Sequence, residues 1–431
     1  MNLSLTTSET AAYLRTLPAI RERCSRVFEL AKAGKLQYFD YHGAKEQEVA
    51  DFCIEIMKRD YSNFSEIPPH GRWRHLDAGS DRIEPLLAKW TGNSTPPDTR
   101  EQARRLVDLF LVSVLLDAGA GSVWTYTEKS SGKQFSRSEG LGVASFHMFE
   151  SGFFSSDPSQ PHQVDAQGLS RITVEKTAEA MQVGEANPMV GLEGRTSLLV
   201  NLSKALSASP EFFGTNGRPG NIVDFLETHA QTKDGKTNVP LAALWSALID
   251  GLNPIWPSRL SLGGIALGDV WPSTALAKEG SGVEAEDLVP FHKLTQWLTY
   301  SLIEIFQKVL QWNIDGIEEM TGLPEYRNGG LLVDLGVLSL KPGLLPVDET
   351  SGLPRVPPSH PAIVEWRAMT VIELDRIADI IRKTLSLSSQ DLSLAQVLES
   401  ATWKGGREIA KSKRPATGGP PIEIESDGTV F

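Results

Sequence analysis

The clearest pattern of apolar and polar positions lies between residues 287 and 338. Apolar side chains recur there at steps of three and four, the period of a helix with one buried face: Leu294, Leu298, Leu302, Ile305 and Val309. Pro290 has no backbone N–H, so we expect it in the first turn of this helix. A turn at Gly322-Leu323-Pro324 and an apolar run interrupted by Asp334 follow. The pattern predicts a long helix and then a tight turn that carries charged side chains.

Helical spacing also recurs along most of the remaining chain. The segment 101–118 is the most apolar and is expected to form a buried helix. In the segment 361–385 the spacing predicts a helix with these inward side chains: Ile363, Trp366, Thr370, Leu374, Ile377 and Ile381. Further helices are predicted at 9–34, 44–61, 141–152, 164–181, 186–207, 220–230 and 239–252.

Only short extended segments are expected. Residues 35–42 fit a short strand, and residues 122–138 alternate and turn at Ser131-Gly132, which indicates a hairpin. A second small hairpin is possible on Ser426-Asp427-Gly428. The fold class is therefore predicted to be predominantly α, with a small β element between about 120 and 140.

Composition narrows the class of protein. The chain has 431 residues, 40% hydrophobic and 22% charged, as expected for a globular protein with a substantial core. A net charge of −12 argues against a nucleic-acid surface, because phosphate backbones are held by clustered lysine and arginine. Small anionic ligands remain possible, since a single cation in a pocket suffices for them.

The sequence contains neither a recognisable targeting signal nor a cysteine motif for metal binding. Cys24 and Cys53 are too few for a disulfide scaffold and lack the spacing of a metal knuckle, so we expect no metal and no cofactor. No secretory signal and no membrane-spanning segment is recognised, so a cytoplasmic location is expected and a nuclear one stays open. We expect an N-terminal helical region at 1–100, a catalytic core at 101–390 and a C-terminal extension at 391–431.

One loop concentrates cationic and aromatic side chains. Residues 67–82 contain His70, Arg72, Trp73, Arg74 and His75 between prolines and glycines. Such a loop suits contact with a phosphate or carboxylate. A surface loop whose arginines pair with acids of the chain explains it equally well.

Six segments together carry a family resemblance: HGRWRH, FHMFESGFFSSDP, NPMVGLEGR, LGDVW, LVPFHKLTQW and GLPEYRNGGLLVDLGVL. With these segments the chain resembles the uracil catabolism protein 4 family, also called the uracil-regulatable protein 3 family, through nearly its whole length. The resemblance implies a place in a pyrimidine degradation pathway that passes through uridine nucleotides and ribosylurea. The enzymes of that pathway are the possible protein partners.

A more distant similarity points to a type of chemistry. Residues 104–375 are similar to the queuosine 5′-phosphate N-glycosylase family in the order of their short motifs. These motifs are Leu116-Asp117-Ala118 through Trp124, Phe291-His292-Lys293 with Gln296, Glu325-Tyr326-Arg327, Leu335-Gly336 and Glu365-Trp366-Arg367. The similarity implies a helical DNA-glycosylase-like fold and a small phosphorylated, ribose-containing substrate.

Two departures from that second family matter. Its catalytic aspartate is replaced by the longer Glu325, so Asp334 could take part of the role. Where it holds a flat bicyclic base, this chain has only small residues: Gly119, Ala120, Gly121 and Ser122. A scaffold without an aromatic clamp suits a different leaving group, such as urea or an opened uracil ring.

The resemblance implies roles for individual residues. A carboxylate beneath the ribose would stabilise the positive charge that develops at the anomeric carbon; we assign this to Glu325, with Asp334 as the alternate. Ribose hydroxyls would bind Asp269 and Glu365. The 5′-phosphate would bind Lys293, Arg327 and Arg72 or Arg74, and the leaving group would contact Tyr326 or His292. The remaining candidate binding residues are Phe291, Trp271, Arg367, Trp124 and His147.

Structural explanations stand beside these roles. Asp334 could satisfy backbone amides, Arg327 could pair with Glu325, and His147 is typical of a hydrogen-bonded core histidine. Two alternatives to a glycosidase also stay open. One is a non-catalytic partner of the pathway's ring-opening enzyme, and the other is an amidohydrolase acting on the opened uracil ring.

Overall fold

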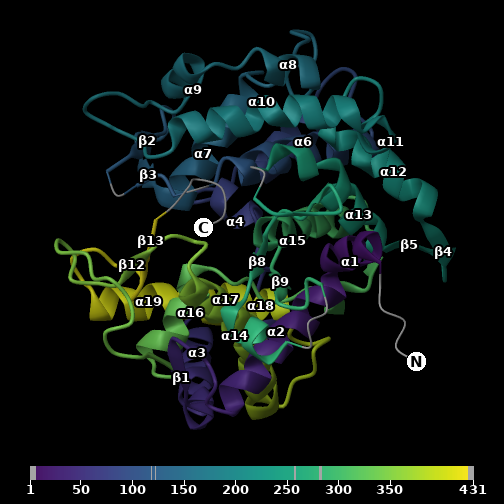
Figure 1. Cartoon of the computed structure of the whole chain (residues 1–431). Coiled ribbons are helices and arrows are strands. Elements are labelled where there is room, and N and C mark those ends of the chain that lie inside the picture. Colours follow the sequence, from purple (N-terminus) through teal and green to yellow (C-terminus); the bar gives the residue numbers. More distant parts are fainter. Residues whose placement is uncertain (1–5, 118, 122, 257–258, 281–283, 426–431) are drawn as a thin grey trace.

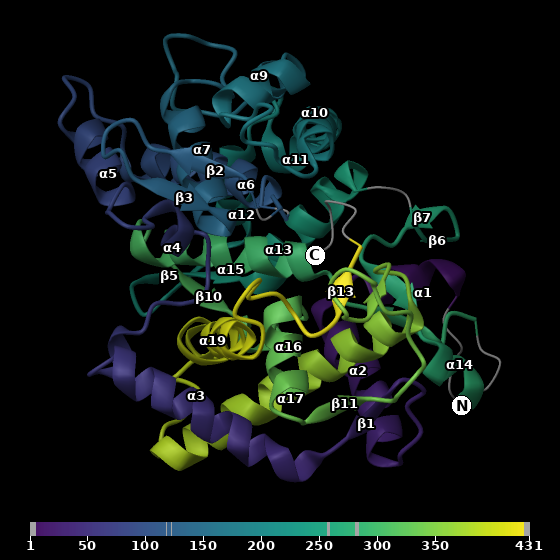
Figure 2. The same cartoon turned by 90° about the vertical axis from the view of Figure 1, so that its left-hand side faces the viewer.

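A computed structural model describes residues 6–117, 119–121, 123–256, 259–280 and 284–425. Helices dominate it, and the strands form only small pairs and one three-stranded sheet, which confirms the predicted fold class. Figures 1 and 2 show two groups of helices, with α15 (Lys293–Lys308) between them. None of the helices in these ranges has the length and apolarity needed to cross a lipid bilayer.

The first group contains helices from both ends of the chain. It comprises α2 (Leu17–Lys32), α3 (Glu46–Asp60), α16 (Tyr326–Asp334), α17 (Pro361–Leu385) and α19 (Trp403–Lys413). The purple N-terminal helices α2 and α3 lie against the yellow-green α17 in both views (Figures 1 and 2). This packing places segments more than three hundred residues apart in the sequence side by side.

The second group is built from the middle of the chain. It comprises α6 (Thr99–Leu115), α7 (Arg137–Glu150), α10 (Leu192–Ala208), α12 (Ile222–His229) and α13 (Leu241–Gly251). Helix α15 packs against α6 and α13 and so connects this group with the other. The remaining helices are α1 (Thr7–Leu14), α4 (Trp73–Leu76), α5 (Ile83–Thr91), α8 (Ala166–Ser170), α9 (Val174–Ala180), α11 (Pro210–Phe213), α14 (Thr274–Glu279) and α18 (Leu394–Val397).

Strands are short. The predicted hairpin is confirmed as the antiparallel pair β2 (Thr125–Thr127) and β3 (Gln134–Ser136). The other pairs are β1 (Phe39–Tyr41) with β11 (Leu338–Leu340), β6 (Ser261–Leu262) with β7 (Ile265–Ala266), β8 (Val270–Pro272) with β9 (Leu288–Pro290), and β12 (Arg355–Val356) with β13 (Glu423–Ile424). In the three-stranded sheet, β5 (Lys236–Pro240) lies between β4 (Gln231–Lys233) and β10 (Asn313–Asp315). The second hairpin expected on Ser426-Asp427-Gly428 lies outside the described residues.

The periodicity predictions are confirmed for the long helices. All six side chains predicted to face inward from α17 are at most 1% exposed. One hydrophobic cluster includes Val27, Phe110 and Val397, so all three segments of the expected domain division contribute to a common core. Burying such apolar surface supplies the main driving force for folding.

Four local predictions are wrong. The helix expected at 9–34 is divided into α1 and α2, because Thr16 caps a new helix. Pro290 lies in β9 rather than in a helix, because His292 adopts a left-handed conformation (φ 45°, ψ 38°) and delays the helix until Lys293. The helix expected at 164–181 is divided into α8 and α9, since Thr173 caps a new helix by accepting a hydrogen bond from the Lys176 amide. The loop at 67–82 contains the short helix α4.

The contact of α19 with α16 depends on a glycine. A Cβ at Gly406 would lie 2.1 Å from the carbonyl oxygen of Arg327, in the first turn of α16. A Cβ at the adjacent Gly405 would meet only side chains, the nearest being Phe52 at 3.3 Å. The close approach of the two helices therefore requires glycine at 406 and not at 405.

We expect Gly406→Ala to lower the free energy of unfolding by about 2 kcal/mol or more, because steric overlap outweighs the gain in helix propensity. Gly405→Ala is the matched control and should stay within about 1 kcal/mol of the wild type. Urea unfolding followed by circular dichroism measures both. Equal stability of the two variants would contradict this account of the helix contact.

Candidate functional site

The carboxylate of Asp269 lies where three segments meet. Arg367 on α17 donates to both of its oxygens at 2.8 Å, Trp271 Nε1 donates at 2.6 Å, and the Lys293 backbone amide donates at 3.0 Å. Burial alone would raise the pKa of Asp269, but the Arg367 guanidinium and these hydrogen bonds outweigh it and hold the pKa well below its ordinary value. Asp269 is therefore an ionised link between β8, α15 and α17.

Two aromatic neighbours complete this support. The Arg367 guanidinium lies 4.1 Å from the centre of the Phe291 ring, within range of a cation–π contact. The ring of His292 turns toward the N-terminal segment, where its Nε2 lies 2.8 Å from the carbonyl oxygen of Leu14. His292 thus fixes the turn that precedes α15, and its role at a leaving group stays a prediction.

Lys293 is the first residue of α15 and is only partly buried. Burial lowers the pKa of its ammonium group, and the charge of Glu325 is the strongest effect opposing this. Asp269 and Asp117 also attract it, whereas Arg367 repels it. The charges of Lys293 and Glu325 therefore act on each other.

Glu325 is the N-cap of α16. Its Oε2 accepts a hydrogen bond from the Arg327 amide at 2.7 Å, and its Oε1 accepts one from the Asn328 amide at 2.5 Å. Burial nevertheless raises the pKa of Glu325 above its ordinary 4.5, against the pull of these amides and of Lys293. Its carboxylate is fixed in direction by these amides, and burial raises its pKa.

Tyr326 adjoins Glu325 and belongs to the same cluster. Burial raises the pKa of its phenol, and the charges of Arg327, Glu325 and Asp117 act on it. The Arg327 guanidinium lies 5.0 Å from the centre of the Tyr326 ring and donates to the Gly418 carbonyl at 2.6 Å. Tyr326 is therefore a neutral hydrogen-bond donor beside a carboxylate, while Arg327 connects α16 with the segment after α19.

Sequence reasoning missed Asp117, which follows the C-terminus of α6. Asp117 Oδ2 forms an ion pair with Arg72 Nη1 at 2.9 Å. The charge of Asp117 also acts on Lys293, Tyr326 and Arg195. The available signal was the Leu116-Asp117-Ala118 motif followed by glycines, to which no role was given. Arg72 is fully buried and supports Asp117 through this ion pair, and its role at a phosphate stays a prediction.

Both expected carboxylate partners of Glu325 lie elsewhere. Asp334 ends α16, about 13 Å from the start of that helix at 1.5 Å per residue, and pairs with Arg414. Glu365 accepts hydrogen bonds from the backbone amides of Gln37 at 2.8 Å and Tyr38 at 2.9 Å. Both oxygens of Glu365 are thus engaged by the N-terminal segment, so neither acid is brought to the cluster.

Arg74 and Trp124 also take structural positions. Arg74 pairs with Glu304 on α15. Trp124 is fully buried and its Nε1 donates to the Met181 carbonyl at 2.9 Å. These contacts anchor neighbouring segments and leave the two side chains away from Glu325.

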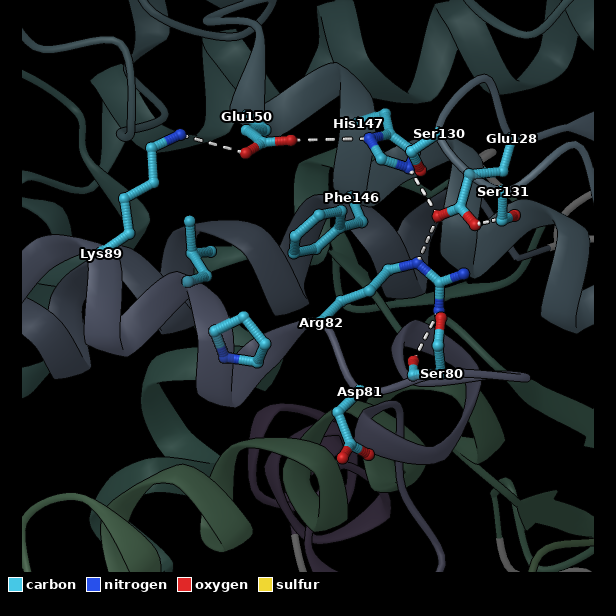
Figure 3. A pocket seen from close by; sticks show the side chains of 12 residues that line it. Ser80, Asp81, Arg82, Lys89, Glu128, Ser130, Ser131, Phe146, His147 and Glu150 are labelled. Atoms are coloured by element: carbon cyan, nitrogen blue, oxygen red, sulfur yellow. Dashed lines mark hydrogen bonds and ion pairs between the residues drawn. The ribbon is translucent and has the colours of Figure 1, made fainter.

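His147 lies in a separate recess of about 310 Å³, shown in Figure 3. There it contacts Glu128 at 3.0 Å, and Glu128 also accepts a hydrogen bond from Arg82 at 2.8 Å. A second, polar recess of about 460 Å³ lies beside Asp165 and Ser203. Neither recess includes Lys293 or Glu325, so His147 is not brought together with the cluster.

The cluster of Lys293, Glu325, Tyr326 and Asp117 combines complementary chemical groups. It places a carboxylate of raised pKa beside an ammonium of lowered pKa, at the N-termini of α16 and α15. The partial positive charge at each helix N-terminus is met by a carboxylate of the chain, Glu325 at α16 and Asp269 at α15. Within the described ranges, no group of three or more histidine, cysteine, aspartate or glutamate side chains is arranged to hold a metal ion.

Comparisons with known proteins cover nearly the whole chain. A family model described as a protein of unknown function (DUF1688) matches residues 13–431. Uracil catabolism protein 4 of Lachancea kluyveri is 43% identical over 444 aligned positions, which include 99% of this chain and all of that protein. Protein urg3 of Schizosaccharomyces pombe is 44% identical over 428 positions, covering 98% of this chain and all of that protein. These relatives confirm the first of the two resemblances drawn from the motifs.

The Asp269–Arg367 pair generates a stability prediction. We expect Asp269→Asn to destabilise the fold by about 3–5 kcal/mol, because the buried Arg367 loses its compensating carboxylate. The double variant Asp269→Asn/Arg367→Met should be less destabilised than the sum of the two single variants, by about 1 kcal/mol or more. Chemical unfolding of all three proteins measures this coupling.

The exposed pair of Lys45 and Glu48 offers the control. Glu48→Gln makes the same change from acid to amide and should leave stability nearly unchanged. Additive effects at Asp269 and Arg367 would show that the pair does not link the segments.

Proposed function

Because this chain belongs to the DUF1688 family and is 43% identical to a Lachancea kluyveri protein named for uracil catabolism, we propose that it takes part in uracil catabolism. Its reaction is the hydrolysis of an N-glycosidic bond in a ribosylurea-type ribose 5-phosphate. The clustering of Glu325, Lys293, Tyr326 and Asp117, drawn from three separate segments, is the observation that carries this proposal.

The reaction requires a carboxylate and a source of water. The bond between the anomeric carbon and nitrogen breaks with its electron pair leaving on nitrogen, and positive charge develops on the ribose. Glu325 stabilises that charge and takes a proton from the attacking water, whose oxygen bonds to the anomeric carbon. The leaving nitrogen gains a proton, so the products are ribose 5-phosphate and urea.

The opposite pKa shifts support this assignment. Burial makes the Glu325 carboxylate a stronger base than an exposed glutamate, which suits it to accept a proton from water. Lys293 supplies a cation for the 5′-phosphate at the start of α15. The Tyr326 hydroxyl is placed beside Glu325 to donate a hydrogen bond to the leaving group.

Asp269 receives a revised role in this proposal. Its oxygens are engaged by Arg367, Trp271 and the Lys293 amide, so it positions Lys293 rather than a ribose hydroxyl. Phe291 acts with it by packing against Arg367. Asp269, Arg367, Trp271 and Phe291 together support the start of α15.

Replacement of Glu325 tests the reaction. We expect Glu325→Gln to lower kcat by at least about a hundredfold, with retained binding of ribose 5-phosphate, because a neutral amide neither accepts the proton nor stabilises the cation. The control is Asp334→Asn at the far end of α16, which should keep wild-type turnover. The assay follows ribose 5-phosphate and urea released from ribosylurea 5′-phosphate.

Product identity separates the proposal from its alternatives. Release of ammonia without ribose 5-phosphate would indicate an amidohydrolase. Absence of any turnover by the folded wild-type protein would overturn the hydrolase proposal and favour a non-catalytic partner.

The pH dependence tests Lys293. Its ammonium is lost as the pH rises through its pKa, which burial places below the ordinary 10.5, so kcat/KM should fall on the alkaline side below pH 10.5. On the acid side the Glu325 carboxylate is lost above pH 4.5, but the substrate phosphate titrates near pH 6 as well. The alkaline limb is therefore the diagnostic one.

Lys293→Arg keeps a cation that stays protonated throughout this range. We expect its alkaline limb to move to higher pH or to disappear. An alkaline midpoint unchanged in Lys293→Arg would exclude Lys293 as the titrating group.

A further inference from the structure

The carboxyl group of Glu373 lies inside the contact between α17 and α3. Helix α3 and strand β1 both pack beside α17 (Figures 1 and 2), and the Glu373 side chain is fully buried there. Neither of its oxygens has a hydrogen-bond partner among the residues that the structure describes. Buried carboxylates are normally paired or hydrogen-bonded, so these two oxygens indicate an unusual protonation state.

The guanidinium of Arg376 is committed to a different acid. Its Nε donates to Glu46 Oε1 at 2.9 Å, and its Nη2 donates to Glu46 Oε2 at 2.8 Å. The same Nε lies 4.0 Å from Glu373 Oε1, which is beyond the range of a hydrogen bond. Tyr41 on β1 also donates its hydroxyl proton to Glu46. One guanidinium thus faces two carboxyl groups and neutralises only Glu46.

Helix α2 contributes an aromatic ring to this cluster. The centre of the Phe28 ring lies 5.3 Å from that of Tyr41 and 5.1 Å from the Arg376 guanidinium. Lys32, also on α2, is exposed, and its ammonium lies 5.2 Å from the centre of the Phe28 ring. The described surroundings of Glu373 therefore combine an acid, a phenol, a paired guanidinium and an apolar ring, and none of these groups donates to it.

An ionised Glu373 would be unstable in this position. A charge removed from water without donors costs free energy, and repulsion by the Glu46 carboxylate adds to the cost. Protonation removes both costs and turns Glu373 into a donor. A carboxylate oxygen can accept two hydrogen bonds, and Glu46 Oε2 accepts one within the described residues, from Arg376. In agreement with this geometry, burial and the charge of Glu46 raise the pKa of Glu373 from 4.5 to about 8.

We propose that Glu373 is a carboxylic acid at neutral pH and donates its proton to the Glu46 carboxylate, so that the two side chains form a proton-sharing pair. The pair fastens the middle of α17 to the first residue of α3. Because the donor exists only while Glu373 is protonated, this link between the helices is lost in alkaline solution. Helix α17 also carries Arg367, the partner of Asp269, so the link acts on the helix that supports the start of α15.

The stability of the fold therefore depends on pH in a defined direction. In the unfolded chain the pKa of Glu373 returns to its ordinary 4.5, whereas in the fold it is raised to about 8. The folded state binds more protons between these values, so the stabilisation is complete below pH 4.5 and is lost as the pH rises toward 8. Over this interval the equilibrium constant for unfolding rises by up to about tenfold per pH unit.

Urea unfolding of the full-length protein between about pH 6 and pH 8 tests the pair. In Glu373→Gln the amide is a donor at every pH, so we expect the ratio of the wild-type to the variant unfolding constant to rise at least about tenfold over this range. Glu55→Gln replaces an exposed acid on the same helix α3 and is the matched control, for which the ratio should stay constant. A constant ratio for Glu373→Gln would overturn the proposal.

Infrared spectroscopy detects the proton without unfolding the protein. The carbonyl stretch of a carboxylic acid is distinct from the bands of a carboxylate, so the spectrum of the wild type at about pH 7 should contain an acid band that Glu373→Gln lacks. In Glu46→Gln, Arg376 is released to pair with Glu373, which then ionises, so we expect the band to be absent there too. This second variant gives the same test where Glu373→Gln fails to fold. An acid band that persists in Glu46→Gln, or that the wild type lacks, would contradict the shared proton.

Discussion

The carboxylate of Asp269 is the constraint on which the arrangement of the site depends. It joins the strand β8, the first residue of α15 and the second turn of the core helix α17 through four hydrogen bonds. Because a buried charge is costly without partners, each of these donors is effectively obligatory. The position of Lys293 is therefore set by a residue that need not touch any substrate.

The same principle explains the cationic loop at 67–82. Its histidines and arginines serve as internal ties instead of a ligand surface: His70 contacts Glu399 at 2.7 Å and its ring lies against Trp403, while Arg72 pairs with Asp117. One loop thus contacts both the C-terminal helices and the end of α6. An arginine-rich loop is compatible with the net negative charge of the chain, because each arginine is neutralised by an individual carboxylate.

The sequence predicts the long helices well because their periodicity is local. In α17 the expected and observed bounds coincide, and every inward position is buried. The direction of the side chains at the site cannot be predicted from such local periodicity. The partners of Asp334 and Glu365 are Arg414 and the amides of residues 37 and 38, and no local pattern reveals contacts over such separations. Pro290 was expected in the first turn of a helix because it has no backbone N–H. A position in a short strand tolerates this absence equally well.

The packing of α19 on α16 has a consequence for when the site can form. The first turn of α16, which carries Glu325 as its cap, is enclosed by Gly406 and by the hydrogen bond from Arg327 to Gly418. A nascent chain lacks these residues until its synthesis has passed position 418. The first turn of α16 is thus enclosed only once residues 406–418 have been added, and a polypeptide shortened before them leaves Glu325 without this cover.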